Sequence, residues 1–300
     1  MFPSTSPTTD GAPTGPDDGQ PDEIEITPVR PALSAAIAAF AALLGIGLIF
    51  GVQSTSPGAR VSFALVVAGV QVLFLLAWTM ATRPPALMVV GGLSLAVAFV
   101  ADLLAVNSAK AGIGPLVLVG LAGLATAVVA QVIRPDDRRR VVESLGATMI
   151  LVAGGVAFAT LIVLSRIPRG TQVIFVCFAA AAVALVVARL VDAVYPRPRL
   201  APQVARGAAG VIFGAMAGTL LSAVIGSYLY TFSPTSAAVV GLVTAVAAVL
   251  ADLAADYTEA GRQMAGDPPT LWVARHMQGP LGGFALAAPA VYLMTVLFLT

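Results

Sequence analysis

The chain has 300 residues, of which 58% are hydrophobic and only 10% are charged, and its mean hydropathy is +0.94. A soluble domain has about 25% charged residues, so this composition excludes an ordinary water-soluble fold. The formal net charge is +1 and the basic residues are scattered along the chain, whereas nucleic-acid binding needs them gathered on one face. We therefore expect membrane lipids as partners, with other membrane proteins as an alternative, and no nucleic acid.

The first 30 residues form a polar tail. They are rich in Pro, Gly, Ser, Thr and acid, and six acidic residues precede Arg30, the first arginine. Because such a segment buries too little apolar surface to offset its chain entropy, we expect residues 1–30 to be disordered. A secretory signal has a basic start followed directly by an apolar core. We therefore interpret the tail as retained and the first apolar run as a membrane anchor.

Nine apolar runs follow, each close to the roughly 20 helical residues that cross a hydrocarbon core. Backbone N–H and C=O groups have no water partners in lipid, and the runs lack the alternation of a membrane barrel, so we predict an all-α polytopic helical bundle. We divide it into a first part, 31–165, with helices one to five, and a second part, 166–300, with helices six to nine. The runs cover 31–52, 61–81, 86–106, 112–133, 145–165, 172–190, 208–230, 236–256 and 281–299.

The basic residues predict an orientation. Twelve of them fall on one side of the predicted membrane, four of these in the cluster 134–140, and four fall on the other side. By the positive-inside rule, the N-terminus and the 257–280 loop are cytoplasmic and Thr300 is outside. The preference for arginine and alanine is typical of a GC-rich bacterial genome, so we expect the bacterial cytoplasmic (inner) membrane. The four residues on the outer side are Arg60, Lys110, Arg166 and Arg169.

Two acidic residues, Asp102 and Asp252, fall inside apolar runs. An ionisable group within the bilayer is costly and therefore raises a functional hypothesis. Both lie within one or two turns of a predicted helix end, where a carboxylate reaches interfacial water. We favour that interpretation for Asp102, near the outer face, and leave both open for Asp252. A small-solute or proton-coupled transporter that uses both residues is one alternative, and it requires a water-filled cavity joining them.

Asp252 has acidic neighbours at helical spacing. Asp256 and Glu259 follow at i+4 and i+7, so all three carboxylates project from one face of a helix that continues beyond the membrane. Three acids in one stripe repel each other unless a cation meets them. Mg²⁺ or Mn²⁺ would suit such oxygen ligands, and an arginine such as Arg262 is the alternative. With Asp267, these residues form our candidate polar site.

The remaining polar features carry weaker signals. The proline-stiffened loop 195–206 contributes Arg197, Arg199 and Arg206, which are candidate contacts for phosphate or lipid headgroups, although membrane topology also explains them. His276 and the lone Cys177 belong to no motif for a catalytic triad or a zinc site, so we assign no catalytic residue. We expect His276 to lie in a solvated loop.

From about Gln172 to the end, the order of these features resembles the CDP-diacylglycerol synthase family, the phosphatidate cytidylyltransferases. The segment GLVTAVAAVLADLAADYTEAGRQMAGD, 241–267, is similar to the family helix bearing Gly-Asp-Leu, a Glu-Ser pair, a Lys-Arg pair and a Lys-Asp. APQVARGAAGVIFGAMAG, 201–218, is similar to its Ser-Pro-Lys-Lys loop and glycine-rich helix, and GPLGGFALAAPAVYLM, 279–294, to its closing Pro-Gly-His-Gly-Gly and Asp-Arg.

This sequence departs from the family at most of the polar positions. Asp252 keeps the aspartate of Asp-Leu, Asp267 matches the later aspartate with shifted spacing, and Gly282 and Gly283 keep the Gly-Gly pair. The Glu-Ser, Lys-Arg, paired-lysine, histidine and Asp-Arg positions hold other residues, namely Ala255, Asp256, Glu259, Ala260, Gln203, Val204, Leu281, Leu286 and Ala287.

The resemblance implies a degenerate member that keeps the fold and has lost the reaction. Cytidylyl transfer to phosphatidate needs metal-binding carboxylates and basic donors around the phosphates, and most of those groups are absent from the matched positions. We therefore expect a noncatalytic lipid- or protein-binding role in membrane or envelope biogenesis, without a cofactor. An active metal-dependent phospholipid cytidylyltransferase, which would use Mg²⁺ around Asp252, Asp256 and Asp267, is the other alternative.

Overall fold

The computed structural model describes residues 26–54, 60–133, 140–229, 232–268 and 270–298. Within these ranges the chain forms nine α-helices, each long and apolar enough to cross a membrane, which confirms the predicted all-helical, polytopic fold. They are α1 (Pro31–Gln53), α2 (Arg60–Thr82), α3 (Leu87–Asn107), α4 (Gly114–Ile133), α5 (Val141–Ser165), α6 (Gly170–Val194), α7 (Ala208–Tyr228), α8 (Pro234–Met264) and α9 (Trp272–Phe298).

Some of the predictions lie outside the described residues. These are the disorder of residues 1–25, the positions of Arg134, Arg138 and Arg139 in the basic cluster, and the placement of Thr300. The helix order puts the start of α1, the end of α6, the end of α8 and the start of α9 at one end of the bundle, which we call the cavity end. That this end is cytoplasmic stays a prediction.

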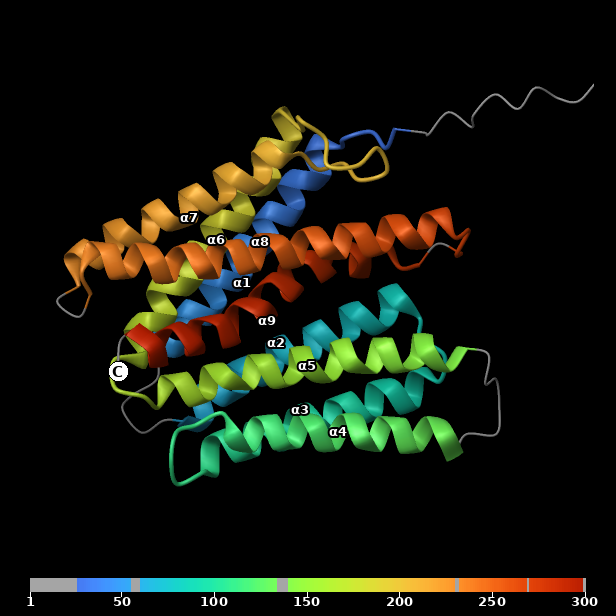
Figure 1. Ribbon diagram of the computed structural model, residues 1–300, viewed down its shortest axis with the longest axis horizontal. Helices are drawn as coiled ribbons and strands as arrows, with labels where there is room; N and C mark the ends of the chain where they lie inside the picture. The colour runs from blue at the N-terminus through green and yellow to red at the C-terminus, as the bar shows by residue number, and fades with distance from the viewer. Residues whose placement is uncertain (1–25, 55–59, 134–139, 230–231, 269, 299–300) are drawn as a thin grey trace, which may run out of the picture.

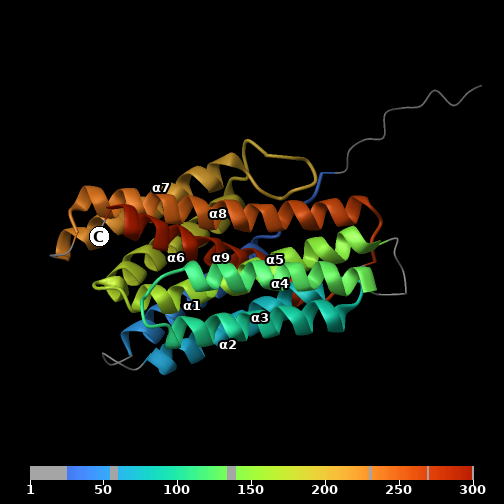
Figure 2. The same cartoon turned by 60° about the horizontal axis from the view of Figure 1, so that its bottom comes forward.

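The helices pack in two groups that do not follow chain order (Figure 1). One group consists of α2 to α5. In the other, α6 packs against α1, α7 and α8, while α9 packs against α8 and also contacts α2 and α5 of the first group. Figure 2 shows the same arrangement from another side. Because α1 lies with α6, the spatial grouping differs from the sequence division into 31–165 and 166–300, which remains a prediction about domains.

Small residues permit the close contacts in the second group. Gly214 and Gly218 of α7 lie against the backbone carbonyls of Ala184 and Ala180 in α6, leaving no space for a side chain at either glycine. In a membrane, helix association rests on such packing because lipid tails are as apolar as the side chains. The two glycines therefore bring α7 onto α6 beside the site described below.

Two helices extend well beyond their apolar runs. α8 begins after a capping box, in which the Ser233 hydroxyl accepts a hydrogen bond from the Ser236 N–H at 3.0 Å. It continues to Met264, eight residues past the predicted end at 256, and is followed by Gly266 in the left-handed conformation with φ +74°. The prediction that the stripe of three carboxylates lies on one continuous helix is therefore confirmed.

The predicted C-terminal boundary of the 257–280 loop is wrong. α9 begins at Trp272, nine residues before the predicted start at 281, and places Arg275 and His276 on a helix. The prediction failed because a proline usually marks the first turn of a helix, whereas Pro280 lies inside α9. A helix in a membrane protein tolerates an internal proline when neighbouring groups satisfy the freed carbonyl.

Candidate functional site

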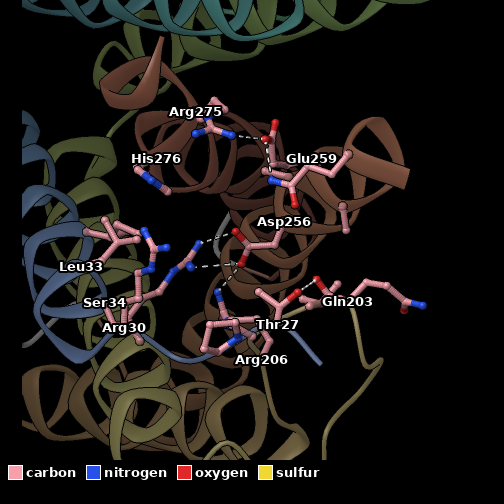
Figure 3. Close-up of a pocket in the computed structure, with 18 of the residues that line it drawn as sticks. Thr27, Arg30, Leu33, Ser34, Gln203, Arg206, Asp256, Glu259, Arg275 and His276 are labelled. Atoms are coloured by element: carbon pink, nitrogen blue, oxygen red, sulfur yellow. Dashed lines mark hydrogen bonds and ion pairs between the residues drawn. The ribbon is translucent and has the colours of Figure 1, made fainter. Parts of the chain in front are cut away.

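A cavity of about 310 Å³ opens at the cavity end of the bundle, between α1, the 195–207 loop, α8 and α9 (Figure 3). Apolar side chains of α1 and α9, such as Ile37 and Trp272, line part of it. The charged side chains that line it are Arg30, Arg189, Arg206, Asp256, Glu259 and Arg275.

The segment before α1 forms one rim of this cavity. The Thr27 N–H donates to the Pro202 carbonyl at 3.1 Å, the Thr27 hydroxyl donates to the Gln203 carbonyl at 3.0 Å, and Arg199 Nη1 donates to the Thr27 carbonyl at 2.8 Å. Residues 26–30, which we expected to belong to a disordered tail, are therefore held against the 195–207 loop. These contacts set Arg30 at the cavity.

Asp252 lies behind the cavity at the centre of an ion-pair network. Its carboxylate is fully buried, with Oδ1 2.5 Å from Arg189 Nη2 and Oδ2 2.6 Å from Arg206 Nη1. Asp256, one turn along α8, meets the same two arginines at 3.0 and 3.1 Å and is partly exposed to the cavity. The cations that meet the acidic stripe are therefore arginines of α6 and of the loop before α7.

Arg206 joins this network to a second carboxylate of α6. Its Nε forms an ion pair with Asp192 Oδ2 at 2.5 Å, although the two atoms are not aligned for a hydrogen bond. The other oxygen, Asp192 Oδ1, accepts a hydrogen bond from the Gly207 N–H at 2.9 Å. Burial alone lowers the pKa of the Arg206 guanidinium, but the charges of Asp252, Asp256 and Asp192 outweigh it and raise the pKa above its ordinary value. Arg206 therefore stays charged although it is only 2% exposed.

Two glycines make room for these buried charges. A Cβ at Gly279 of α9 would overlap Asp252 Oδ1 and crowd Arg189 Nη2, and a Cβ at Gly210 of α7 would overlap the Asp192 carboxylate. The backbones of α7 and α9 thus pack directly against the Asp192 and Asp252 carboxylates. Sequence patterns gave no signal for Arg189, Asp192 or Gly279, because their partners lie on other helices.

A second ion pair lines the cavity beside the first network. Arg275 Nη1 of α9 donates to Glu259 Oε1 at 2.5 Å, and Gln263 Nε2 donates to the same oxygen at 2.9 Å. One turn along α9, Trp272 packs edge-on against His276 with ring centroids 5.0 Å apart. His276 therefore lines the cavity from a helix, which contradicts the expected solvated loop.

The other predicted site residues do not join the cavity. Asp267 lies in the α8–α9 connection and pairs with Arg262 at 3.3 Å, where its side chain is 43% exposed. Arg197 is exposed and lines a separate surface hollow with Tyr195. Arg199 holds the Thr27 carbonyl, as described above. Of the three arginines predicted to contact headgroups, Arg206 is the one that lines the cavity, and it is buried in ion pairs.

The carboxylates are not arranged as a magnesium site. Across the described ranges, no three His, Cys, Asp or Glu side chains are grouped so that they could hold a metal ion. Both oxygens of Asp252 and both of Asp256 face guanidinium groups, which supply the positive charge that a divalent cation would otherwise provide. The residues at this position therefore do not fit the metal that the enzyme alternative requires.

Asp102 lies near the C-terminal end of α3 and does not line the cavity. It is 8% exposed and accepts a hydrogen bond from Gln71 Nε2 of α2 at 2.9 Å, and the same amide donates to the Gly155 carbonyl of α5 at 2.9 Å. That the Asp102 carboxylate reaches interfacial water stays a prediction. Neither Asp102 nor Asp252 lines the cavity, which removes the main support for a transporter that uses both.

The arginines around the cavity keep hydrogen-bonding capacity. Among the described residues, Arg206 Nη2, Arg189 Nε and Arg275 Nε have no hydrogen-bond partner, although all three atoms are buried. Unsatisfied buried donors are costly, and all three of these donors belong to arginines that line the cavity. Comparison of the chain with protein-family models, with curated proteins and with solved structures found no match.

Proposed function

We propose that this chain is a noncatalytic membrane protein whose cavity binds the phosphate-bearing headgroup of a membrane lipid. The observation that carries the proposal is the set of four arginines that line one cavity at the end of a membrane-spanning bundle. Guanidinium groups are suited to phosphate because their planar donors match its oxygens. Apolar neighbours such as Leu33, Ile37 and Trp272 suit the start of the acyl chains.

We also propose that the protein lies in a bacterial cytoplasmic membrane and acts in envelope biogenesis. We propose further that it is a degenerate relative of the CDP-diacylglycerol synthases. Support for lost catalysis comes from Asp252, the aspartate that matches the family pattern, because two buried arginines occupy both of its oxygens. CTP-dependent conversion of phosphatidate by the purified protein would contradict this part of the proposal.

Arg30 offers a direct test of lipid binding. It is exposed at the cavity and is the cap residue of α1 without a side-chain capping hydrogen bond, so its removal should leave the fold intact. We expect Arg30→Ala to weaken phospholipid binding on the order of tenfold, the effect of one charge-assisted hydrogen bond. Native mass spectrometry of the detergent-solubilised protein with added phosphatidylglycerol and phosphatidylethanolamine measures this.

Arg197→Ala is the matched control. Arg197 is also an exposed arginine near the same end of the bundle, but it lies outside the cavity. Its removal should change binding little. Equal losses in the two variants would indicate general attraction of lipid to a basic surface and would contradict a headgroup site in the cavity.

A further inference from the structure

The cavity has two walls of opposite polarity. The first turn of α1 lines one wall with Arg30, Leu33 and Ser34, and the last turns of α8 line the other with Asp256 and Glu259 (Figure 3). A helix carries partial positive charge at its N-terminus and partial negative charge at its C-terminus. The two helix ends therefore reinforce the charges of the side chains that they carry.

The formal charges of the site cancel. With His276 counted as neutral, the cavity lining and the buried network behind it contain four arginines and four carboxylates. A ligand with a net charge would leave that charge uncompensated at the end of an apolar bundle, where desolvation is costly. A ligand that carries both signs avoids this cost. The eight groups are Arg30, Arg189, Arg206, Arg275, Asp192, Asp252, Asp256 and Glu259.

The cavity lining keeps capacity for a ligand. Arg206 of the 195–207 loop is 2% exposed, lines the cavity and has an Nη2 without a hydrogen-bond partner among the described residues. On the α8 wall, Glu259 accepts hydrogen bonds from Arg275 and Gln263, and both of these bonds are to Oε1. The other oxygen, Oε2, lies 4.0 Å from Arg262 Nη1. A carboxylate accepts about four hydrogen bonds, so Glu259 retains room for a donor.

We propose, building on the headgroup site above, that the preferred ligand is a zwitterionic phospholipid whose headgroup bears a phosphate and a primary ammonium. The phosphate lies at the first turn of α1, where Arg30, the Ser34 hydroxyl and the helix N-terminus favour an anion. The ammonium donates to Oε2 of Glu259 on α8. A cavity of about 310 Å³ is at the lower end of the roughly 300–1,000 Å³ of small-molecule sites, which suits a headgroup.

Binding of three lipids separates the possible headgroups. Phosphatidylethanolamine carries a phosphate and an ammonium, phosphatidylglycerol lacks the ammonium, and phosphatidylcholine carries a quaternary ammonium that cannot donate a hydrogen bond. We expect phosphatidylethanolamine to bind on the order of tenfold tighter than either of the others in native mass spectrometry. Glycerophosphoethanolamine, which has the same headgroup without acyl chains, should compete only weakly. Competition as strong as that of the whole lipid would overturn the lipid as ligand.

Glu259→Gln tests where the ammonium lies. The amide keeps an acceptor for Arg275 but removes the negative charge, so the preference for phosphatidylethanolamine over phosphatidylglycerol should fall to near unity. Glu143→Gln, which changes an exposed carboxylate paired with Arg140, should leave the preference unchanged. A preference for phosphatidylglycerol, or a preference unaffected by Glu259→Gln, would overturn the zwitterionic ligand while leaving the headgroup site standing. Failure of every phospholipid to bind would contradict the headgroup site itself.

Discussion

Asp252 is fully buried and bonded to two arginines, so its charge is part of the packing between α6, α8 and the loop before α7. A buried ion pair adds little net stability compared with apolar residues, but removing one partner leaves the other as an uncompensated charge. Without Asp252, Arg189 would keep Asp256, and Arg206 would keep Asp256 and Asp192, so each arginine would lose part of its charge compensation. The residue therefore ties three segments together instead of presenting a free carboxylate to the cavity.

We expect Asp252→Asn to lower the free energy of unfolding by roughly 1.5–3 kcal/mol, because two buried guanidinium groups each lose a charged hydrogen-bond acceptor while they keep Asp256. Unfolding of the detergent-solubilised protein by SDS, followed by circular dichroism, measures this. Asp267→Asn is the control, since Asp267, whose side chain is 43% exposed, pairs with Arg262 near the surface, and such pairs contribute about 1 kcal/mol or less. Similar small losses in both variants would contradict a structural role for the buried network.

At the scale of elements, the contact of α9 with α8 depends on a glycine. α9 passes so close to Asp252 that position 279 has no space for a side chain, whereas a Cβ at Gly282 would meet only Trp78 at an ordinary distance of 3.7 Å. The two glycines lie one turn apart on the same helix. Comparing alanine substitutions at the two positions therefore separates the effect of close helix approach from the effect of glycine on helix formation.

Gly279→Ala should destabilise the protein by about 1–3 kcal/mol, since overpacking forces α9 away from the ion pairs. Gly282→Ala should be neutral or stabilising, because alanine in a helix is favoured over glycine by roughly 1 kcal/mol. Thermal unfolding of the two variants in detergent gives the comparison. If Gly279→Ala were as stable as Gly282→Ala, α9 would not lie as close to Asp252 as described.

The position of α1 is a property of the whole molecule. Consecutive helices are usually neighbours, yet α1 packs mainly on α6, more than a hundred residues further along the chain. Gly45 of α1 faces Ala182 of α6 and Phe284 of α9 without space for a side chain, whereas Gly47 has no neighbour within 4 Å. This packing fixes the start of α1, and with it Arg30, at the cavity.

Gly45→Leu should therefore reduce the free energy of unfolding by about 1–3 kcal/mol through overpacking, and Gly47→Leu should be tolerated because that position is exposed on the apolar surface of the bundle. Unfolding by SDS again measures the difference. The opposite ranking would indicate that α1 packs elsewhere, for example along α2.

The sequence by itself determined the fold class, because the cost of unsatisfied backbone groups in lipid makes every long apolar run a helix. It also identified the carboxylate stripe Asp252, Asp256 and Glu259, since residues at i, i+4 and i+7 share a face of any helix. Helix ends were less predictable. Hydropathy marks only the apolar core of a span, so the polar first turns of α9 were missed.

Only the tertiary structure decided which groups meet. Arg189 and Arg206 are 63 and 46 residues from Asp252 in sequence, and no local pattern encodes such a pairing. The same holds for Arg30, which reaches the cavity because α1 packs on α6 and because Thr27 bonds to the 195–207 loop. Helix periodicity is a local property, whereas the partners of a buried charge are set by how the helices pack, and that packing turns an acidic stripe into a charge-balanced cavity.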